Sequence, residues 1–318
     1  YEAKPWLSAM KFEHNITIPG LSPLYPTIFC TGDYSVCEMT TGEGEINAAA
    51  SVTAMGLSPL FDLSHTYFLI SGIGGGEPQY TTMGSVTFAK YAVQVALEYE
   101  TAYQDFSNTH ANWTSGYWAY GTENPWTYPG NVYGTEVFEV NENLRNRAVE
   151  LAETATLENG TEANAANRLL YNETAARGLP SVVKCDALTS DNYFTGNTYC
   201  STAQEDNASL EAFTRLHRYG LTDYNRVVVM RSISDFTRPP PSKSNDTVGW
   251  FNNPEDGGSH VAFANLPIAG MPLVEDILEN WDDVYYSGKK YGPENYTGDI
   301  FNTLGGTPDF GKSSFAVA

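Results

Sequence analysis

Hydrophobic and polar residues follow two different periods along the chain. Short apolar runs predict strands at residues 27–30, 67–70, 84–89, 91–100, 179–186 and 227–230. Apolar residues that recur every three or four positions predict helices at residues 42–56, 141–156, 162–176, 207–217 and 267–288. Strands that alternate with helices are typical of an α/β protein, and neither an internal repeat nor a long linker divides the sequence. We therefore expect a single α/β domain over residues 1–318.

The strand expected at residues 227–230 is followed by polar residues that could bind a ligand. The segment reads RVVVMRSISDF over residues 226–236, so an arginine, two serines and an aspartate follow the apolar run. Ligands of open α/β sheets bind outside the carboxyl ends of strands, which makes Arg231, Ser234 and Asp235 candidate site residues. A simpler interpretation is that Asp235 caps a following helix or turn, and the pattern alone favours it.

Two glycine-rich turns offer further candidates. They read GEGEIN at residues 42–47 and SGIGGG at residues 71–76, and neither fits the dinucleotide-binding pattern GxGxxG. A GxSxG serine-hydrolase turn is also absent from the sequence. Glycine lets a backbone approach a ligand closely, so Gly72, Ile73 and Gly74 are candidate contacts, with simple turn geometry as the alternative. Neither turn contains Arg or Lys, whereas the first contains Glu43 and Glu45, so phosphate is not the expected ligand.

Charge and composition narrow the classes of partner. The net charge of −21 opposes binding to nucleic acid or to an anionic membrane surface. A continuous run of about 18 apolar residues is missing, so we expect no membrane-spanning segment. Metal-binding motifs of the CxxC and HExxH types are absent too, and the sequence predicts neither a metal nor a cofactor.

The cysteines and glycosylation motifs indicate an exported protein. Sequence proximity alone favours the disulfides Cys30–Cys37 and Cys185–Cys200 among three possible connectivities. No signal peptide is recognisable, and we expect Tyr1 to begin a processed or trimmed chain. The seven N-x-[ST] motifs favour a secreted glycoprotein. They lie at Asn15, Asn112, Asn159, Asn172, Asn207, Asn245 and Asn295.

Several uncommon stretches, in order, resemble the fungal purine nucleoside permease family over nearly the whole chain. They are TTGEGEINAAAS, FDLSHTYFLISGIGG, MGSVTFAKYAVQV, YGTEVFEVN, KCDALTSDNYFTGN, TAQEDNASLEAFTRL and VVVMRSISDF. That family is similar to the nucleoside phosphorylase and nucleosidase superfamily, with a pattern nearest to methylthioadenosine nucleosidase. The resemblance implies a three-layer domain with a central mixed sheet flanked by helices, and a homodimer. It also implies that a first strand is missing upstream of Tyr1.

The resemblance assigns roles to the residues at the end of the strand. Asp235 would protonate the purine and make it a better leaving group, with Ser234 orienting its carboxyl group. An aspartate can do this near neutral pH only if its pKa is raised or if it shares a proton with the base. Arg231 and Glu211 would hold the ribose hydroxyls and the attacking water. Tyr193 would stack on the base, at a gain of about 1–3 kcal/mol, with Phe194 as the alternative.

Other assignments stay open. Glu205, Asp206 and Asn207 compete with Glu211 for the ribose, although Asn207 also begins a glycosylation motif. The other implied contacts are the turn residue Asp191 for the substrate, Glu2 for the water, and Ile73 in place of a serine that helps to bind water.

We interpret the chain as a secreted purine nucleosidase that hydrolyses adenosine, inosine or guanosine to base and ribose. A soluble nucleoside-binding component of uptake and a phosphate-dependent phosphorylase are the alternatives. The irregular, aromatic-rich stretch at residues 104–135 is long for a loop, which indicates a functional or interface segment.

Overall fold

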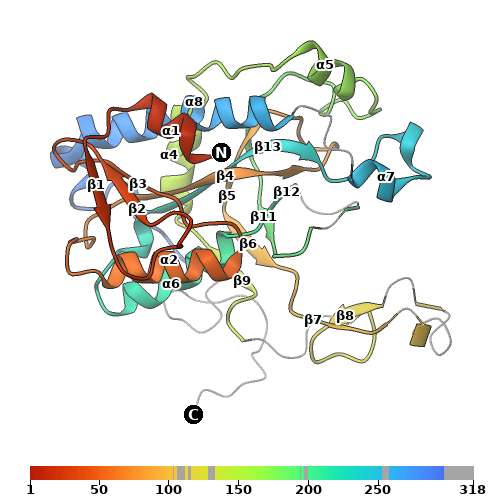
Figure 1. Ribbon diagram of the computed structural model, residues 1–318, viewed down its shortest axis with the longest axis horizontal. Coiled ribbons are helices and arrows are strands. Elements are labelled where there is room, and N and C mark those ends of the chain that lie inside the picture. The colour runs from red at the N-terminus through yellow and green to blue at the C-terminus, as the bar shows by residue number, and fades with distance from the viewer. Residues whose placement is uncertain are drawn as a thin grey trace.

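A computed structural model describes residues 1–102, 104–105, 112–113, 116–127, 133–193, 195–196, 200–252 and 258–296. Its centre is an eight-stranded mixed sheet with the order β10-β5-β13-β4-β12-β11-β6-β9 (Figure 1). The strands in that order are β10 (Val182–Lys184), β5 (Val86–Ala89), β13 (Val227–Phe236), β4 (Phe68–Gly76), β12 (Ser201–Ala203), β11 (Ala187–Thr189), β6 (Tyr91–Gln94) and β9 (Val137–Glu139).

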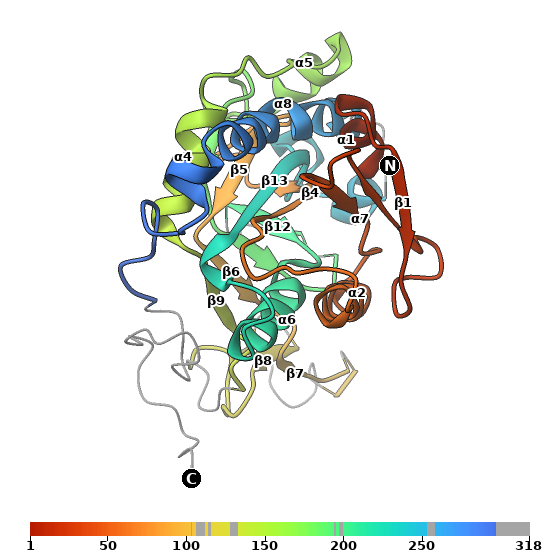
Figure 2. The same ribbon diagram turned by 90° about the vertical axis from the view of Figure 1, so that its left-hand side faces the viewer.

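Helices cover both faces of this sheet, which confirms the expected α/β architecture (Figure 2). On one side lie α2 (Glu45–Leu57) and α6 (Asp206–Arg218), which pack on the sheet through Val52, Leu210 and Phe213. On the other side lie α4 (Glu142–Ala152) and α8 (Gly258–Glu279), with α1 (Ala3–Ala9) against α8. The short helices α5 (Glu162–Arg168) and α7 (Thr247–Phe251) lie outside these layers.

The strands β4 and β13 are longer than the sequence pattern predicted. Their apolar runs end near residue 70 and residue 230, but pairing continues to Gly76 and Phe236. The two strands are parallel, with Arg231 opposite Gly72, and the register shifts between Ile233 and Asp235. The glycine segment therefore forms part of the sheet, because its backbone pairs with β13. The bulge re-aims the end of β13, as such irregularities do near sites.

Other differences come from tertiary pairing. The strands β9, β11 and β12 have three residues each. They are stabilised by hydrogen bonds to neighbouring strands, which a local sequence pattern does not predict. Helix α5 ends at Arg168, earlier than expected, and a five-residue α7 forms where the sequence pattern predicted no helix. A separate small sheet contains β1 (His14–Thr17), β2 (Thr27–Cys30) and β3 (Cys37–Met39).

Helix α8 is the one helix of the described ranges that is long and apolar enough to cross a bilayer. Polar residues interrupt its apolar positions, so the absence of a continuous apolar run did not predict it. It begins at Gly258, nine residues before the expected start at 267, and it contains Pro267 and Pro272. Its buried residues include Val261, Leu266 and Leu273, which pack against β13, β4 and α4, as the residues of a core helix do.

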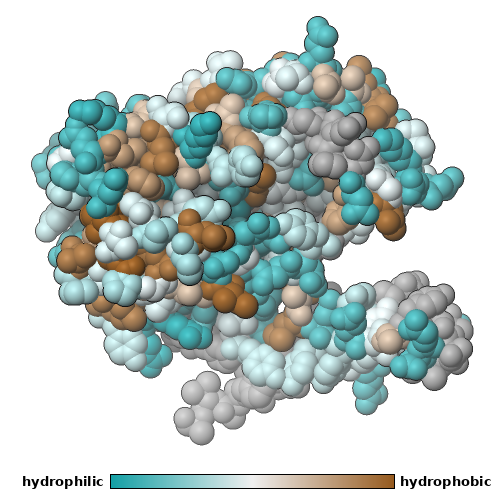
Figure 3. Space-filling model, in the orientation of Figure 1, coloured by the Kyte–Doolittle hydropathy of each residue, from teal (hydrophilic) through white to brown (hydrophobic). Residues whose placement is uncertain are grey.

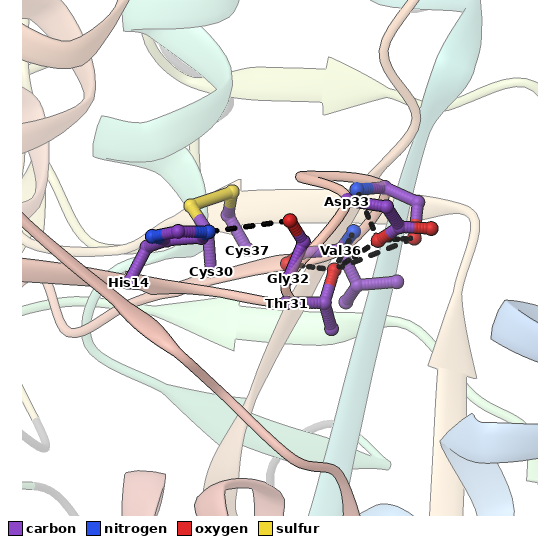
Figure 4. The surroundings of a disulfide bond; sticks show 8 residues. His14, Cys30, Thr31, Gly32, Asp33, Val36 and Cys37 are labelled. Carbon is purple, nitrogen blue, oxygen red and sulfur yellow. Dashed lines mark hydrogen bonds between the residues drawn. A yellow bond between two sulfur atoms is a disulfide. The ribbon is translucent and has the colours of Figure 1, made fainter.

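The two disulfides are Cys30–Cys37 and Cys185–Cys200, as sequence proximity predicted. Figure 4 shows how the first closes the turn between β2 and β3. Within this turn the Thr31 hydroxyl donates to Asp33 Oδ1 over 2.8 Å. The disulfide thus closes the turn of residues 31–36 into a fixed hairpin end.

A strand within the aromatic-rich stretch, β8 (Tyr117–Ala119), pairs with β7 (Glu98–Glu100), which precedes the stretch, and the two form an arm. The arm stands away from the helices and the main sheet (Figure 1, Figure 3). Tyr99 contacts Trp118 and Tyr120 in tilted ring pairs, so neighbouring aromatic rings support one another here. The homodimer stays a prediction.

We predict that Gly270→Leu on α8 displaces α1. A Cβ at Gly270 would lie 2.4 Å from the Trp6 ring, whose Nε1 donates to Ser71 Oγ over 3.2 Å. Overpacking of this kind costs about 1–3 kcal/mol of unfolding free energy, measurable by urea denaturation. Glu275→Leu places the same side chain at an exposed position of α8 and is the control. Equal stability of the two variants would contradict close packing of α1.

Candidate active site

The site is built around the side chain of Arg231, which is 4% exposed on β13. Its guanidinium lies beside Gly72 of β4, where a Cβ would come within 2.5 Å of Nη1. Nη1 donates to the Ile73 carbonyl over 3.2 Å. The glycine is therefore required here for space, because any larger residue would collide with the buried cation.

Three carboxylates from two distant parts of the chain surround this guanidinium. Nη2 donates to Glu205 Oε2 over 3.0 Å, and Nε donates to Asp206 Oδ1 over 3.0 Å. Glu2 accepts from the Ile73 amide over 2.5 Å, and its charge also acts on Arg231. The structure thus brings together Arg231 and Glu2, as the resemblance implied, and gives Glu205 and Asp206 the contact expected of Glu211.

Burial and charge act in opposite directions on this cluster. Burial disfavours the charged form of Arg231, but Asp206 and Glu205 outweigh it and raise the pKa of the guanidinium above its ordinary value. Asp206 is fully buried, and this burial raises the pKa of its carboxyl group, although Arg231 opposes the shift. The cluster therefore contains a permanent cation and a carboxyl group that is costly to ionise.

Backbone amides at both glycine turns donate to carboxylates of the same chain. Gly44 N donates to Glu205 Oε1 over 2.9 Å, and Glu45 N donates to Asp191 Oδ1 over 2.7 Å. Gly44 begins α2 with a φ of 91°, a conformation that favours glycine. The amino end of α2 therefore binds anionic groups that the protein itself supplies.

Asp235 is exposed near the carboxyl end of β13, beyond the bulge. The Ser234 hydroxyl donates to Asp235 Oδ1 over 2.6 Å and is 3.2 Å from the Gly74 carbonyl. This pairing is the arrangement expected of a serine that orients the aspartate. Because Asp235 lies within a strand that continues to Phe236, it does not begin a helix.

Arg231 and Asp235 lie at the two ends of the glycine-rich segment of β4 at residues 72–75, which we call the glycine floor. Arg231 pairs in register with Gly72, and Asp235 pairs with Gly75. At about 3.3 Å of rise per residue, four residues of strand span about 13 Å, which the bulge shortens. Such a span suits an elongated ligand with one end at the carboxylate cluster and the other at Asp235.

The predicted stacking residue has a different contact. Tyr193 is 68% exposed, and its hydroxyl donates to Glu43 of the first glycine turn. This hydrogen bond, together with partial burial, raises the pKa of Tyr193 to about 12. The ring thus bridges two loops at the rim. Phe194, the alternative for stacking, lies outside the described residues.

The hydrogen bonds of the Arg231 guanidinium described above go to Asp206, Glu205 and Ile73, and none of them goes to Glu211 or Asn207. Glu211 pairs with Arg215 one helical turn further along α6, at 2.6 Å. Asn207 is 4% exposed, accepts from the Thr189 hydroxyl over 2.7 Å and donates to Glu45 Oε1 over 2.7 Å. Its side chain therefore joins α6 to β11 and α2. The amino end of α6, rather than its middle, carries the residues that face the cation.

Comparison with known proteins places these residues in a family. The family model described as "Purine nucleoside permease (NUP)" matches residues 1–198 and 197–290. The purine nucleoside permease of Candida albicans is 62% identical, covering 100% of this chain and 82% of that protein. A Schizosaccharomyces pombe protein named "Probable purine nucleoside permease" is 40% identical, covering 88% of this chain and 87% of its own length.

This chain belongs to the purine nucleoside permease family. Its fold is that of 5'-methylthioadenosine/S-adenosylhomocysteine nucleosidases. The enzyme from Campylobacter jejuni has a TM-score of 0.51 at 13% identity, covering 86% of this chain and 94% of the enzyme. The enzyme from Neisseria meningitidis, in complex with methylthio-immucillin-A, has a TM-score of 0.50 at 12% identity, covering 88% and 94%. At these identities the likeness concerns the fold alone.

In this member of the permease family, six of the seven glycosylation motifs have an exposed asparagine. They are Asn15, Asn112, Asn159, Asn172, Asn245 and Asn295. Asn207 is the exception, because its buried amide is hydrogen-bonded at both its oxygen and its nitrogen. A glycan on that nitrogen would have no room, so the sequence motif at Asn207 is not a glycosylation site in the folded protein.

The sequence motifs of this permease-family chain did not predict that carboxylates would bind the amides of the glycine turns. A signal was present in the consecutive acids Glu205 and Asp206, which precede an apolar helix pattern. Acidic residues are favoured at the positive, amino-terminal end of a helix, so Glu205 and Asp206 indicate where α6 begins. The sequence did not predict that these acids would pair with Arg231, because Arg231 is remote from them in the chain.

We predict that the raised pKa of Asp206 makes the stability of this permease-family protein depend on pH. Since the folded-state pKa exceeds the unfolded value of about 3.9, the contribution of Asp206 is present below that pH and is lost as pH rises through the folded-state pKa. The difference in unfolding free energy between wild type and Asp206→Asn should therefore fall as pH rises from about 4. Urea titrations across pH measure it. A difference that grows with pH would mean that ionised Asp206 stabilises the fold.

Proposed function

We propose that the protein binds purine nucleosides across the glycine floor and hydrolyses their N-glycosidic bond with water. One observation carries this proposal: the amides of Gly44, Glu45 and Ile73 donate to Glu205, Asp191 and Glu2. A nucleophilic phosphate would need such amides or cationic side chains, since anions bind at helix amino ends and arginines. Carboxylates in these positions repel an anion and favour neutral water.

The attacking water is assigned to Glu2 and Arg231. Oε1 of Glu2 and Nη1 of Arg231 both lie close to the position that a Cβ of Gly72 would occupy, at 2.9 and 2.5 Å. A carboxylate can accept a proton from water, while the guanidinium donates to its oxygen. The Ile73 amide donates to the Glu2 carboxylate and thereby fixes its position next to Gly72.

The sugar and the base are assigned to opposite ends of the site. Glu205, partly exposed beside Arg231, is placed to accept hydrogen bonds from ribose hydroxyls. Asp235 donates a proton to the purine as the bond breaks, and Ser234 orients it. The surrounding carboxylates also stabilise the positive charge that develops on the sugar in an oxocarbenium-like transition state.

Export of the protein is part of the proposal. The two disulfides and the six exposed asparagines in N-x-[ST] motifs support an extracellular glycoprotein. Water is available in any such compartment, so a hydrolase would not depend on a supply of phosphate.

A second candidate is a nucleoside-binding role in uptake without turnover. It is favoured by the names of the relatives from Candida albicans and Schizosaccharomyces pombe, which are both purine nucleoside permeases. The same site would then recognise the nucleoside through Glu205 and Asp235 and release it unchanged. Turnover therefore separates the two candidates.

Incubation of the protein with adenosine, inosine and guanosine, followed by chromatography, tests the proposal. We expect free base and ribose without added phosphate. Asp235→Asn should lower the rate by about 10²–10⁴, the range for loss of a general acid. Asp62→Asn is the matched control, because Asp62 likewise accepts from a nearby serine, Ser64, but in an exposed loop.

Three other results would change the assignment. Release of base only with phosphate would indicate a phosphorylase, and binding without release would support the uptake role. Full activity of Asp235→Asn would remove that residue as the acid.

We predict that Glu205 and Glu211 differ sharply despite their place near or on the same helix. Glu205→Gln should lower kcat/KM by about 10- to 100-fold, because hydrogen bonds to charged groups contribute about 1.5–3 kcal/mol. Glu211→Gln changes only a pair with Arg215 and should stay within about twofold. Steady-state kinetics with inosine make the comparison. The reverse order of effects would return the ribose role to Glu211.

A further inference from the structure

Asp206 is a buried carboxyl group to which the proposed reaction gives no direct role. It is the first residue of α6 and its side chain is 0% exposed, in contrast to Glu205 beside it, at 16%. Glu205 and Asp206 thus both pair with Arg231, but the Glu205 side chain is partly exposed whereas the Asp206 side chain is buried. Glu205 faces the rim of the site, and Asp206 lies behind it.

The hydrogen bonds of Arg231 divide its guanidinium into two edges. Nε and Nη2 both donate to Asp206 Oδ1, and Nη2 also donates to Glu205. Nη1 points the other way, toward the Ile73 carbonyl and the space over Gly72 where Glu2 lies. Because a guanidinium is planar, a fixed Nε–Nη2 edge also fixes the direction of the two N–H groups on Nη1.

The charge of Asp206 is expensive to keep in this position. Oδ2 of Asp206 is buried without a hydrogen-bond partner among the residues that the structure describes. The charged groups that face Asp206 are Arg231 from β13 and Glu205 at the start of α6, and Glu2 acts on the far side of the guanidinium. A buried group with an unpaired atom calls for a reason beyond stability.

We propose that Asp206 is a positioning residue, which fixes the Arg231 guanidinium so that Nη1 and Glu2 hold the attacking water over Gly72. This inference rests on the proposed hydrolysis. Asp206 does not touch the nucleoside, because it is fully buried behind Glu205. It acts on the nucleophile through Arg231, whereas Glu205 acts on the sugar.

Asp206→Asn tests this role with inosine as the substrate. The variant keeps the shape of the side chain but removes the charge that anchors the Nε–Nη2 edge. We expect kcat to fall by about 10²-fold, the cost of a small misplacement in an active site, while KM stays within about twofold. With one negative charge fewer opposing ionisation of the remaining carboxylates, the acid limb of the kcat profile should move to lower pH.

Two further variants control for effects on folding. Asp276→Asn on α8 removes an equivalent charge from a partly buried pair with Arg147 of α4, away from the site, and should leave kcat and its pH profile unchanged. If Asp206→Asn does not fold, Asp206→Ser provides a smaller side chain that can still accept from Arg231 and should give the same loss of kcat.

The outcomes separate the inference from the proposed function. Unchanged kcat and pH profile in a folded Asp206 variant, with an active wild type, would overturn the positioning role alone. A large rise in KM with unchanged kcat would also overturn it, because Asp206 would then bind the sugar. A wild type that binds inosine without releasing base would overturn the proposed hydrolysis and this inference together.

Discussion

The buried guanidinium of Arg231 is the interaction on which the rest of the site depends. A cation this deep in a protein is tolerated only when it is paired and hydrogen-bonded. Here the partners are Asp206, Glu205 and the Ile73 carbonyl. Removal of any of them would leave charge uncompensated, so the arginine constrains the amino end of α6 and the path of β4 at the same time.

The same constraint explains the glycines. Gly72 leaves room for the guanidinium, and Gly44 turns the chain into α2 while its amide meets Glu205. Through Glu2, which binds the Ile73 amide, the chain's amino-terminal segment joins the cluster as well. Segments remote in sequence are thus held together by one charge, and the resulting cluster carries more carboxylates than cations. An environment of this kind suits a neutral substrate whose reaction develops positive charge.

The names of the relatives and the names of the proteins that share the fold refer to different kinds of protein. The relatives are named as permeases, whereas the fold is shared with nucleosidases. The proposed nucleoside site would be compatible with both, because a binding protein and a hydrolase both need to hold a ribose and a purine. What distinguishes them physically is whether water is held and activated next to the sugar, which is the task assigned to Glu2 and Arg231. The apolar helix α8 does not decide the question, since it packs in the core against β13 and α4.

Much of this architecture followed from the sequence alone. Hydrophobic periods determined the α/β class and the helices α2, α4 and α6, because amphipathic patterns are local. The proximity of the cysteines in the sequence predicted both disulfides. The motif around Asp235 predicted its hydrogen-bond partner Ser234, which is its immediate neighbour in the chain.

Only the tertiary structure decided which acid meets Arg231. Glu205, Asp206 and Glu211 all lie near or on α6, but a helix turns by about 100° per residue, so Glu211 points to Arg215 instead. The extension of β4 and β13 through polar and glycine residues was equally unreadable, because each strand is stabilised by the other. Local sequence determines what a segment can form, whereas pairing between remote segments decides which charges are buried together.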